Sequence, residues 1–334
     1  MSPLRDEGEV TGYTFEPDDD EGFDDAFNAD ITRLFFEGEI VEIFPNLDPG
    51  DQSVLDIGFG VGRQPAFFQE SQMVNDVMDA VSLTKDNLIF PGWTVDRRIT
   101  AFWGWNEVNR DDNREDDSAH LLGLFTEGDW GPSTVQIDAA YVAGEDDGAY
   151  FGAGATQRPI LFGKTVNTSP RANASFALDD EGAQVDDGLL LFSQVSITPT
   201  GSGNLVYNKT FLGIGNNSSA ARDDTAGGPL GQAGVLFAAV GLGNHGAALG
   251  NRGDKSVGSA IGYQMFFNDQ RTQVLLEAGG RAGWDEARSN AAAVGARFQQ
   301  AIGFRYVLRA DTFVAAQDVG DTGLGFRTEF RVNF

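Results

Sequence analysis

Charged side chains recur at every second position in several segments of the chain. Near the C-terminal end, Arg327, Glu329 and Arg331 alternate with Phe326 and Phe330. An extended strand separates these two sets onto opposite faces, whereas a helix would mix them. Side chains of both signs that line a narrow passage create a field that selects which ions enter it. The alternation predicts the following residues for the wall or constriction of such a passage: Glu37, Glu39, Arg63, Gln69, Glu70, Gln72, Glu127, Asp138, Glu277, Arg281, Arg297, Arg309, Arg327, Glu329 and Arg331.

The two signs of charge are unevenly distributed among these positions. Arginine dominates the last four predicted strands, and acidic residues dominate the first six. A closed sheet would therefore place an acidic wall beside or across from a basic one. Two interpretations stay open: the charges select solutes, or they form salt bridges that only fill the interior. The assignment depends on register, because a shift of one residue turns every side chain to the other face.

The segment 63–76 (RQPAFFQESQMVND) is too polar for a strand and too long for a short turn. We expect it to fold inward as a loop that begins at Arg63. Gln69, Glu70 and Gln72 would then lie near the narrowest point of the passage. An ordinary surface loop is the alternative interpretation.

Acidic clusters at 111–112, 115–117 and 145–147 offer the oxygen ligands that Ca²⁺ and Mg²⁺ prefer. Asp111, Asp112, Glu115, Asp116 and Asp117 are the candidate calcium ligands, although none of these clusters has EF-hand spacing. Solvated loops and adaptation to high salt, as in a marine or halophilic source, are the competing interpretations, and we favour them. We therefore expect no metal site.

The sequence offers one weak catalytic candidate, His120 with Asp117 and Ser118 nearby, and we favour a lone histidine on a strand or rim. The only histidines are His120 and His245, and neither belongs to a recognisable metal-binding pair. The chain contains no G-x-S-x-G or H-E-x-x-H motif. It also contains no cysteine, which excludes disulfides, cysteine-based metal sites and covalently attached haem. We expect a protein that is not an enzyme and carries no cofactor.

The elements that position the charged residues are expected to be β-strands. Period-2 alternation recurs from about residue 31 to the last residue, and turn signals such as 46–51 and 268–270 separate the alternating runs. Residues 1–30 are expected to be an acidic lead-in, extended or disordered, and residues 31–334 a single domain. The sequence predicts sixteen strands, with fourteen or eighteen as alternatives: 33–44, 52–62, 76–84, 95–107, 118–128, 133–143, 149–156, 171–178, 189–198, 204–214, 230–243, 256–267, 271–282, 290–300, 305–316 and 322–334.

Composition narrows the class of protein. Lys and Arg total 23 against 50 Asp and Glu, so the formal net charge is −27, which argues against nucleic-acid binding. The longest nearly apolar run, 233–243, has 11 residues. A helix needs about 20 residues to span a membrane, whereas a tilted strand needs only about 9–11. The sequence printed here starts without a recognisable signal peptide.

A membrane barrel explains these observations better than a water-soluble β protein, which hides its apolar face and rarely needs sixteen strands. Short turns that alternate with long polar inserts are typical of outer-membrane barrels. In lipid, an open sheet would leave N–H and C=O groups unpaired, so the first and last strands must pair. The final alternating strand ends on Phe334, and this ending resembles the sorting signal read by the bacterial outer-membrane assembly machinery. We predict an all-β fold, a transmembrane antiparallel up-and-down β-barrel.

One short motif resembles a known family. The run GVGRQP at 60–65, followed by FFQE at 67–70, is similar to the "GRQ…F" element of alginate-export-type and related substrate-selective outer-membrane porins. The similarity covers roughly residues 52–108. It implies a barrel in the outer membrane of a Gram-negative bacterium, whose lumen passes a polar or charged solute. The resemblance does not identify the transported solute. An anionic polysaccharide such as alginate would need a basic track, and this chain has only four lysines.

The expected function is therefore a passive diffusion channel for ions or small polar solutes, with a preference for cations. The expected partners are the lipid bilayer or lipopolysaccharide, the assembly machinery and, by analogy with general porins, two further copies in a homotrimer. One alternative is a non-conducting barrel that acts as scaffold or sheath for a partner protein. Another is a soluble acidic β protein from a halophile.

Overall fold

The computed structural model describes residues 12–14, 22–24, 32–47, 56–88, 96–111, 114–161, 163–179, 184–223, 226–231, 234–238, 246–284, 290–318 and 322–332. The chain divides into two compact units. Unit one comprises Met1–Thr156, Arg171–Leu189 and Asn217–Ala226. Unit two comprises Gln157–Pro170, Leu190–Asn216 and Gly227–Phe334.

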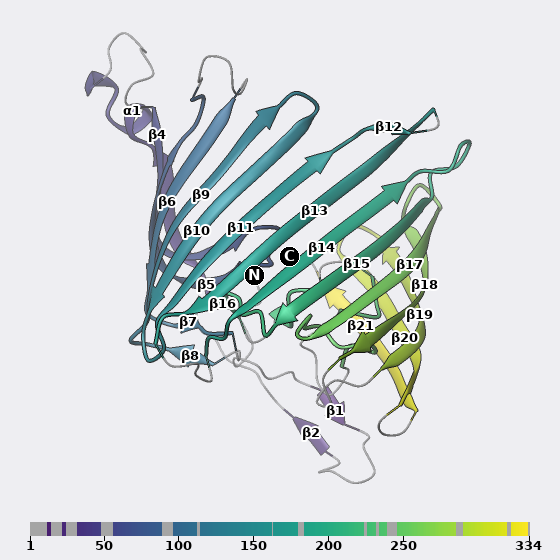
Figure 1. The fold of residues 1–334 in the computed structure, drawn as a ribbon. Coiled ribbons are helices and arrows are strands. Elements are labelled where there is room, and N and C mark those ends of the chain that lie inside the picture. Colours follow the sequence, from purple (N-terminus) through teal and green to yellow (C-terminus); the bar gives the residue numbers. More distant parts are fainter. Residues whose placement is uncertain are drawn as a thin grey trace. The chain divides into compact units, whose positions relative to one another are not determined.

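Unit one is built on long strands that pair with their neighbours in sequence. β3 to β6, β9 and β10 follow one another in antiparallel pairs, and β11 continues the order toward β13. Figure 1 shows these strands side by side in purple to teal. Their bounds are β3 (Leu34–Glu39), β4 (Ile57–Phe68), β5 (Val74–Lys85), β6 (Arg97–Trp105), β9 (His120–Trp130), β10 (Ser133–Ala143), β11 (Gly148–Gln157) and β13 (Lys164–Ala177).

Several short elements accompany these strands. β1 (Gly12–Thr14) pairs with β2 (Gly22–Asp24), and β7 (Val108–Asn109) pairs with β8 (Glu115–Asp116). The helical turns α1 (Ile40–Ile43) and η1 (Pro45–Leu47) follow β3, and β12 (Ile160–Leu161) precedes β13. β16 (Ala221–Arg222) pairs with β5 in parallel. In the part of the chain that the structure describes, no helix is both long and apolar enough to cross a membrane.

Unit two continues the same construction. β15 pairs with β17, and each strand from β17 to β21 pairs antiparallel with the next. The turns at 268–271 and 303–305 are short, which fixes the register of neighbouring strands. The strands are β14 (Gly188–Ile197), β15 (Leu205–Gly215), β17 (Ser256–Phe267), β18 (Thr272–Gly283), β19 (Ala291–Ile302), β20 (Tyr306–Gln317) and β21 (Gly323–Val332).

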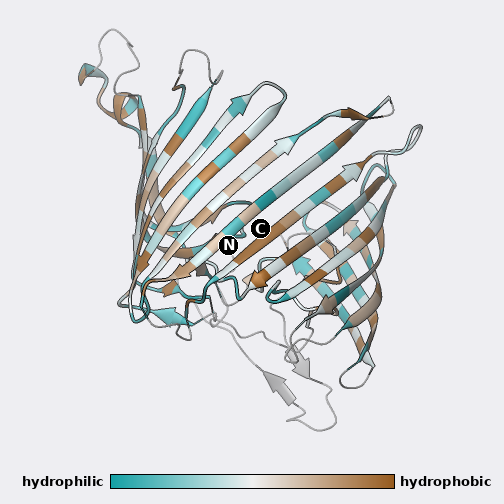
Figure 2. Ribbon diagram, in the orientation of Figure 1, coloured by the Kyte–Doolittle hydropathy of each residue, from teal (hydrophilic) through white to brown (hydrophobic). Residues whose placement is uncertain are grey.

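Strands β18, β20 and β21 expose apolar side chains on one face and cover charged ones on the other, and Figure 2 shows the alternation of hydropathy along them. The covered faces of β14 and β15 also carry apolar side chains, such as Leu190 and Phe211. Val294 and Phe326 are 57% and 74% exposed, whereas Glu277 and Asp311 are 3% and 1% exposed. This is the reverse of a water-soluble sheet, which covers apolar side chains and exposes charged ones. The strand faces predicted from the alternation in 256–267, 271–282 and 322–334 are therefore confirmed.

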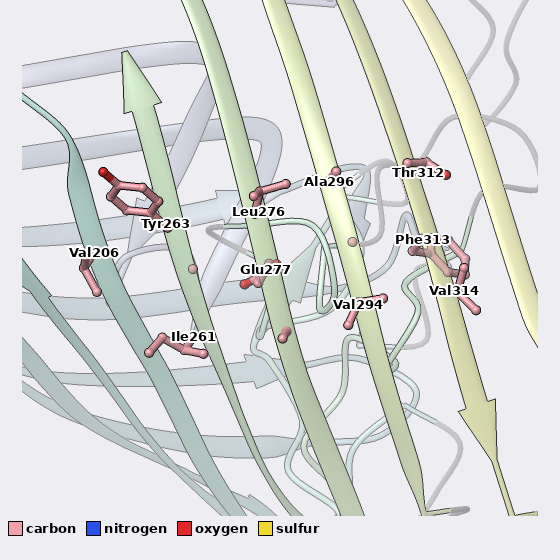
Figure 3. Close-up of a pocket in the computed structure, with 13 residues that line it drawn as sticks. Val206, Ile261, Tyr263, Leu276, Glu277, Val294, Ala296, Thr312, Phe313 and Val314 are labelled. Carbon is pink, nitrogen blue, oxygen red and sulfur yellow. The ribbon is translucent and has the colours of Figure 1, made fainter.

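The exposed face of unit two carries a shallow apolar hollow. Ile261, Leu276, Val294, Ala296 and Val314 are among the residues that line it (Figure 3). These residues lie on four successive strands, β17 to β20. The hollow arises where small side chains alternate with branched ones, and its lining would be in contact with lipid if the sheet spans a membrane.

Two predicted elements are wrong. The segment 63–76 is not a loop: its first part belongs to β4 and its last part to β5, with a tight turn between them. The strand continues through the polar residues because Gln64 and Ala66 face a covered interior, while Phe67 is exposed on the other face. The predicted strand 33–44 ends at Glu39, where α1 begins.

The described residues of 230–243 also form no strand. Residues 230–231 and 234–237 are turns and bends, and their side chains pack into a core cluster with Leu190, Phe211 and Ala260. Because this alternation reflects packing in an interior, not strand pairing, the sixteen-strand count is not confirmed. The all-β antiparallel class is confirmed.

Candidate functional site

The covered face of unit two carries a ladder of charged residues across β19, β20 and β21. Arg297 Nε and Nη2 donate to the two oxygens of Asp311 at 2.7 and 3.2 Å. Arg327 donates to the same carboxylate from the other side. Arg309 pairs with Glu329 at 3.4 Å, and Arg331 pairs with Glu329 at 2.8 Å. The structure thus brings together five of the predicted wall residues and adds Asp311.

The ladder follows directly from strand register. Arg297 lies opposite Asp311, Asp311 lies opposite Arg327, and Arg309 lies opposite Glu329. Cross-strand neighbours of opposite charge attract each other on a shared face. Four arginines face two carboxylates here, so the ladder has a net positive charge. Its guanidinium groups can therefore offer hydrogen-bond donors to a passing solute.

In unit one, the turn after β4 is buried. Gln69 and Gln72 are each 1% exposed, and Gln69, Glu70 and Ser71 all have positive φ angles of 49–64°. Gln69 Nε2 donates to Asp138 at 2.7 Å, and Arg171 Nη1 donates to Gln69 Oε1 at 3.1 Å. Arg171 also forms an ion pair with Glu70. Strained backbone of this kind persists where its surroundings over-determine it.

A segment from the connection between β15 and β17 covers this turn. Ser219 Oγ and Arg222 Nη2 donate to the carbonyl of Gln72 at 3.0 and 3.1 Å. Arg222 Nη2 also donates to the carbonyl of Ser71 at 2.6 Å. Ser219 N donates to Asp111 at 2.7 Å. The 217–223 segment is therefore an inner layer of unit one.

Further described residues of the same connection, among 230–231, 234–238 and 246–249, pack inside unit two. Leu230, Leu236, Phe237 and Leu249 are at most 2% exposed and pack against wall strands β14, β15, β17, β19 and β20. Glu277 and Arg281, two predicted wall residues on β18, contact this segment. The covered face in each unit is thus lined by part of 216–255, and the predicted inward loop at 63–76 does not supply this lining.

The remaining predicted wall residues lie in different environments. Glu127 accepts a hydrogen bond from Gln136 at 2.8 Å on the covered face of β9 and β10. Glu37 and Glu39 are exposed on β3. Arg63 shares its strand face with exposed Val61 and pairs with Glu107. The prediction that Arg63 points inward is therefore wrong, because β4 continues in register with β5 and keeps odd-numbered residues outward.

The acidic clusters join loops of unit one. Asp116 pairs with buried Arg110 at 3.4 Å and accepts hydrogen bonds from Ser118 at 2.6 and 2.9 Å. Burial raises the pKa of Asp116, but the hydrogen bonds from Ser118 and the Glu145 N–H, together with the charge of Arg110, hold the pKa below its usual value. Among the described residues, which exclude Asp112, no acidic or histidine cluster could hold a metal ion.

Four residues of these networks escape the sequence prediction: Arg171, Arg222, Asp311, and Lys209, which lies 3.2 Å from Glu277. Lys209 alternates with Tyr207 and Phe211 along a strand, and this pattern would have placed all three on one face. Arg171 lies in the region where the strand signal is weakest. Arg222 sits in a polar insert that has no periodicity, so no local signal predicts its burial.

An antiparallel sheet with an exposed apolar face and charged residues on its covered face is the arrangement found in outer-membrane β-barrels. Three solved structures are similar to this chain: OccK5 (OpdH) of Pseudomonas aeruginosa, with TM-score 0.58 and 11% identity over 83% of this chain and 78% of that one; OpdK of the same species with vanillate, with 0.60 and 10% over 83% and 75%; and OccAB2 of Acinetobacter baumannii, with 0.55 and 12% over 83% and 72%.

At these identities the likeness shows the fold, and it confirms at that level the expected resemblance to substrate-selective porins. No family model matches the chain. No curated protein matches it either.

Proposed function

We propose that the chain is a porin of the Gram-negative outer membrane, a channel and not an enzyme, through which ions or small polar solutes diffuse passively. The observation that carries this proposal is the pairing of an exposed apolar face with a covered charged face on the same strands. The likeness to OccK5 and OpdK supports it. OpdK is named an outer membrane protein.

In lipid, we infer that the sheet closes into a barrel, because an open edge would leave backbone groups without partners. Its apolar face would contact the bilayer or lipopolysaccharide. We also propose that the assembly machinery reads the last strand, whose terminal Phe334 lies outside the described residues. A homotrimer remains our expectation for the oligomeric state.

The charged residues of the covered face are proposed to line the passage and its constriction. The net charge of −27 and the acidic residues Glu37, Glu39 and Glu127 favour cations. The arginine ladder of β19–β21 favours anions. We propose a weak cation preference, since fixed charges along the whole chain contribute to the field that concentrates counter-ions at the entrance.

The test is the conductance of the refolded protein in a planar bilayer under a salt gradient. Discrete steps support a porin, and a reversal potential toward the cation equilibrium supports the cation preference. An anion-directed potential would assign selectivity to the arginine ladder. Folded, inserted protein that gives no steps would reject the porin. Protein that stays in the aqueous phase without detergent would favour the soluble alternative.

One observation favours a second candidate, the non-conducting scaffold. Segments of 216–255 cover wall residues in each unit, and such a layer could close a passage. Inserted but silent protein, with the same segments still protected from a soluble protease, would support this candidate.

A further inference from the structure

The inner segment of unit two comprises the described residues 230–231, 234–238 and 246–249. β18 binds this segment at two points. Glu277 Oε2 accepts the backbone N–H of Val235 at 2.5 Å and of Leu236 at 2.9 Å. Four residues further on the same face of β18, Arg281 Nη1 donates to the carbonyl of Leu249 at 3.0 Å. Leu249 N donates to the carbonyl of Leu236 at 2.8 Å, so the two attachment points are joined through the segment itself.

Each attachment point requires a glycine. Gly234 has a φ of +83°, and a Cβ there would collide with both oxygens of Glu277. Gly250 has a φ of +73°, and a Cβ there would collide with Nη1 of Arg281. Positive φ is accessible to glycine at little cost. Successive N–H groups at 235 and 236, next to a glycine, form a concave site for an anion, which the Glu277 carboxylate occupies.

Residues on β15 and β19 complement the inner segment in charge and in shape. Lys209, which is 1% exposed, lies 3.2 Å from Glu277 and offsets its charge. The ammonium of Lys209 is also 5.4 Å from the ring centre of Phe237, within cation–π range. On β19, Gly295 leaves room for Leu236, since a Cβ there would come within 2.9 Å of its Cδ2. A buried carboxylate is costly unless it is paired and hydrogen-bonded, and here it is both.

We infer that Glu277 and Arg281 are positioning residues that fix the inner segment against the wall and so set the width and steadiness of the passage. This inference rests on the proposed porin function. The two residues act on solutes through the segment, because Oε2 of Glu277 and Nη1 of Arg281 bind its backbone. They are therefore distinct from the arginine ladder of β19–β21, whose acceptors are wall carboxylates.

The direct test measures release of the segment and needs no conduction. The chain has no cysteine, so Ala248→Cys, at a site that is 4% exposed, introduces a single buried thiol into the segment. A water-soluble thiol reagent should label A248C slowly. In A248C with Glu277→Gln it should label about tenfold faster or more, since a hydrogen bond to a charged group contributes more than the roughly 1.4 kcal/mol that corresponds to a factor of ten.

Matched controls keep the test specific. Asp269→Asn on the exposed turn after β17, and Arg305→Gln on the exposed turn after β19, make similar charge changes away from the segment. Neither should alter the labelling rate. Arg281→Gln removes the second attachment and should also accelerate labelling, and it replaces E277Q if that variant does not fold. Equal labelling in all variants would overturn the inference.

Conductance then separates this inference from the proposed function. Wild-type steps should be steady, whereas E277Q should show a changed step size or rapid flicker. Steady, unchanged steps in E277Q would refute the positioning role and leave the porin intact. A silent wild-type protein with accelerated labelling in E277Q would reject the porin function and support the attachment of the inner segment by Glu277. Gly234→Ala should reproduce E277Q, and the double variant should show no further change, because both remove one interaction.

Discussion

Arg297 and Asp311 are cross-strand neighbours on β19 and β20, joined by two hydrogen bonds of 2.7 and 3.2 Å. Arg327 reaches the same carboxylate from β21. One buried acid thus lies between two guanidinium groups on the covered face. This arrangement makes Asp311 the residue on which the order of the ladder depends.

Asp311→Asn should lower the free energy of unfolding by roughly 2–4 kcal/mol, because it removes one partner of a buried charged pair. It should also shift the reversal potential toward anions, since the covered face gains one net positive charge. Urea unfolding and bilayer recordings measure the two effects. Arg331→Gln is the control: its pair with Glu329 is half-exposed, and such pairs contribute about 0–1 kcal/mol. Equal losses in both variants would contradict the burial argument.

The buried turn at 69–71 has the same backbone conformation as an exposed turn of this chain, at 268–270. Asn268, Asp269 and Gln270 share its positive φ angles, but they are exposed. Gln270→Gly should therefore change stability by no more than about 0.5 kcal/mol, because relief of strain offsets the added freedom of the unfolded chain. Gln69→Gly should cost about 1–3 kcal/mol, because it removes the buried hydrogen bonds that the Gln69 side chain makes with Asp138 and Arg171. Unfolding in urea compares the two, and a neutral Q69G would show that the buried network is unimportant.

Two carboxylates at the loops of unit one predict a pH dependence. Hydrogen bonds from Tyr141 and Gly144 lower the pKa of Asp147, and the hydrogen bonds from Ser118 lower the pKa of Asp116. Lowered values in the folded state stabilise the loops above the usual value of 3.8. That contribution is lost as the pH falls through the lowered values.

Hydrogen exchange at the amides of Ser118 and Gly144, which donate to these carboxylates, measures this effect. Protection should be constant above pH about 5 and fall in stronger acid. Asp116→Asn should reduce protection at Ser118 at every pH and leave Gly144 unchanged. Protection that is independent of pH would contradict the proposed role of the acidic clusters.

The exposed apolar face of unit two allows a test of whether the sheet spans a membrane. Val294 lies at the hollow on this face and is 57% exposed. Val294→Arg should destabilise the protein in a bilayer by roughly 2–4 kcal/mol, because a charge on the lipid face is costly near the midplane. Unfolding from lipid vesicles measures the loss, with Asp269→Asn on the exposed turn as control. A V294R variant that is as stable as wild type in lipid would argue against a membrane-spanning face.

Much of the wall can be predicted from sequence because a strand has a period of two residues. Arg327, Glu329 and Arg331 fall on one face of β21 whatever else the chain does, and their neighbours on β20 follow from a short connection. Asp138 and Glu277 are correctly placed on covered faces for the same reason. The charge of these residues and the strand face on which they lie can be predicted from the local sequence alone.

The inner layer could not be predicted in this way. Residues 230–243 alternate like a strand, yet their described part packs inside unit two, because Glu277 and Gly295 on distant strands provide its partners. The contact between buried Gln72 and buried Arg222 likewise joins chain segments about 150 positions apart. The sequence by itself determined which face of each strand is charged. Only the tertiary structure decided what covers that face, since covering requires complementary groups that meet through folding and not through periodicity.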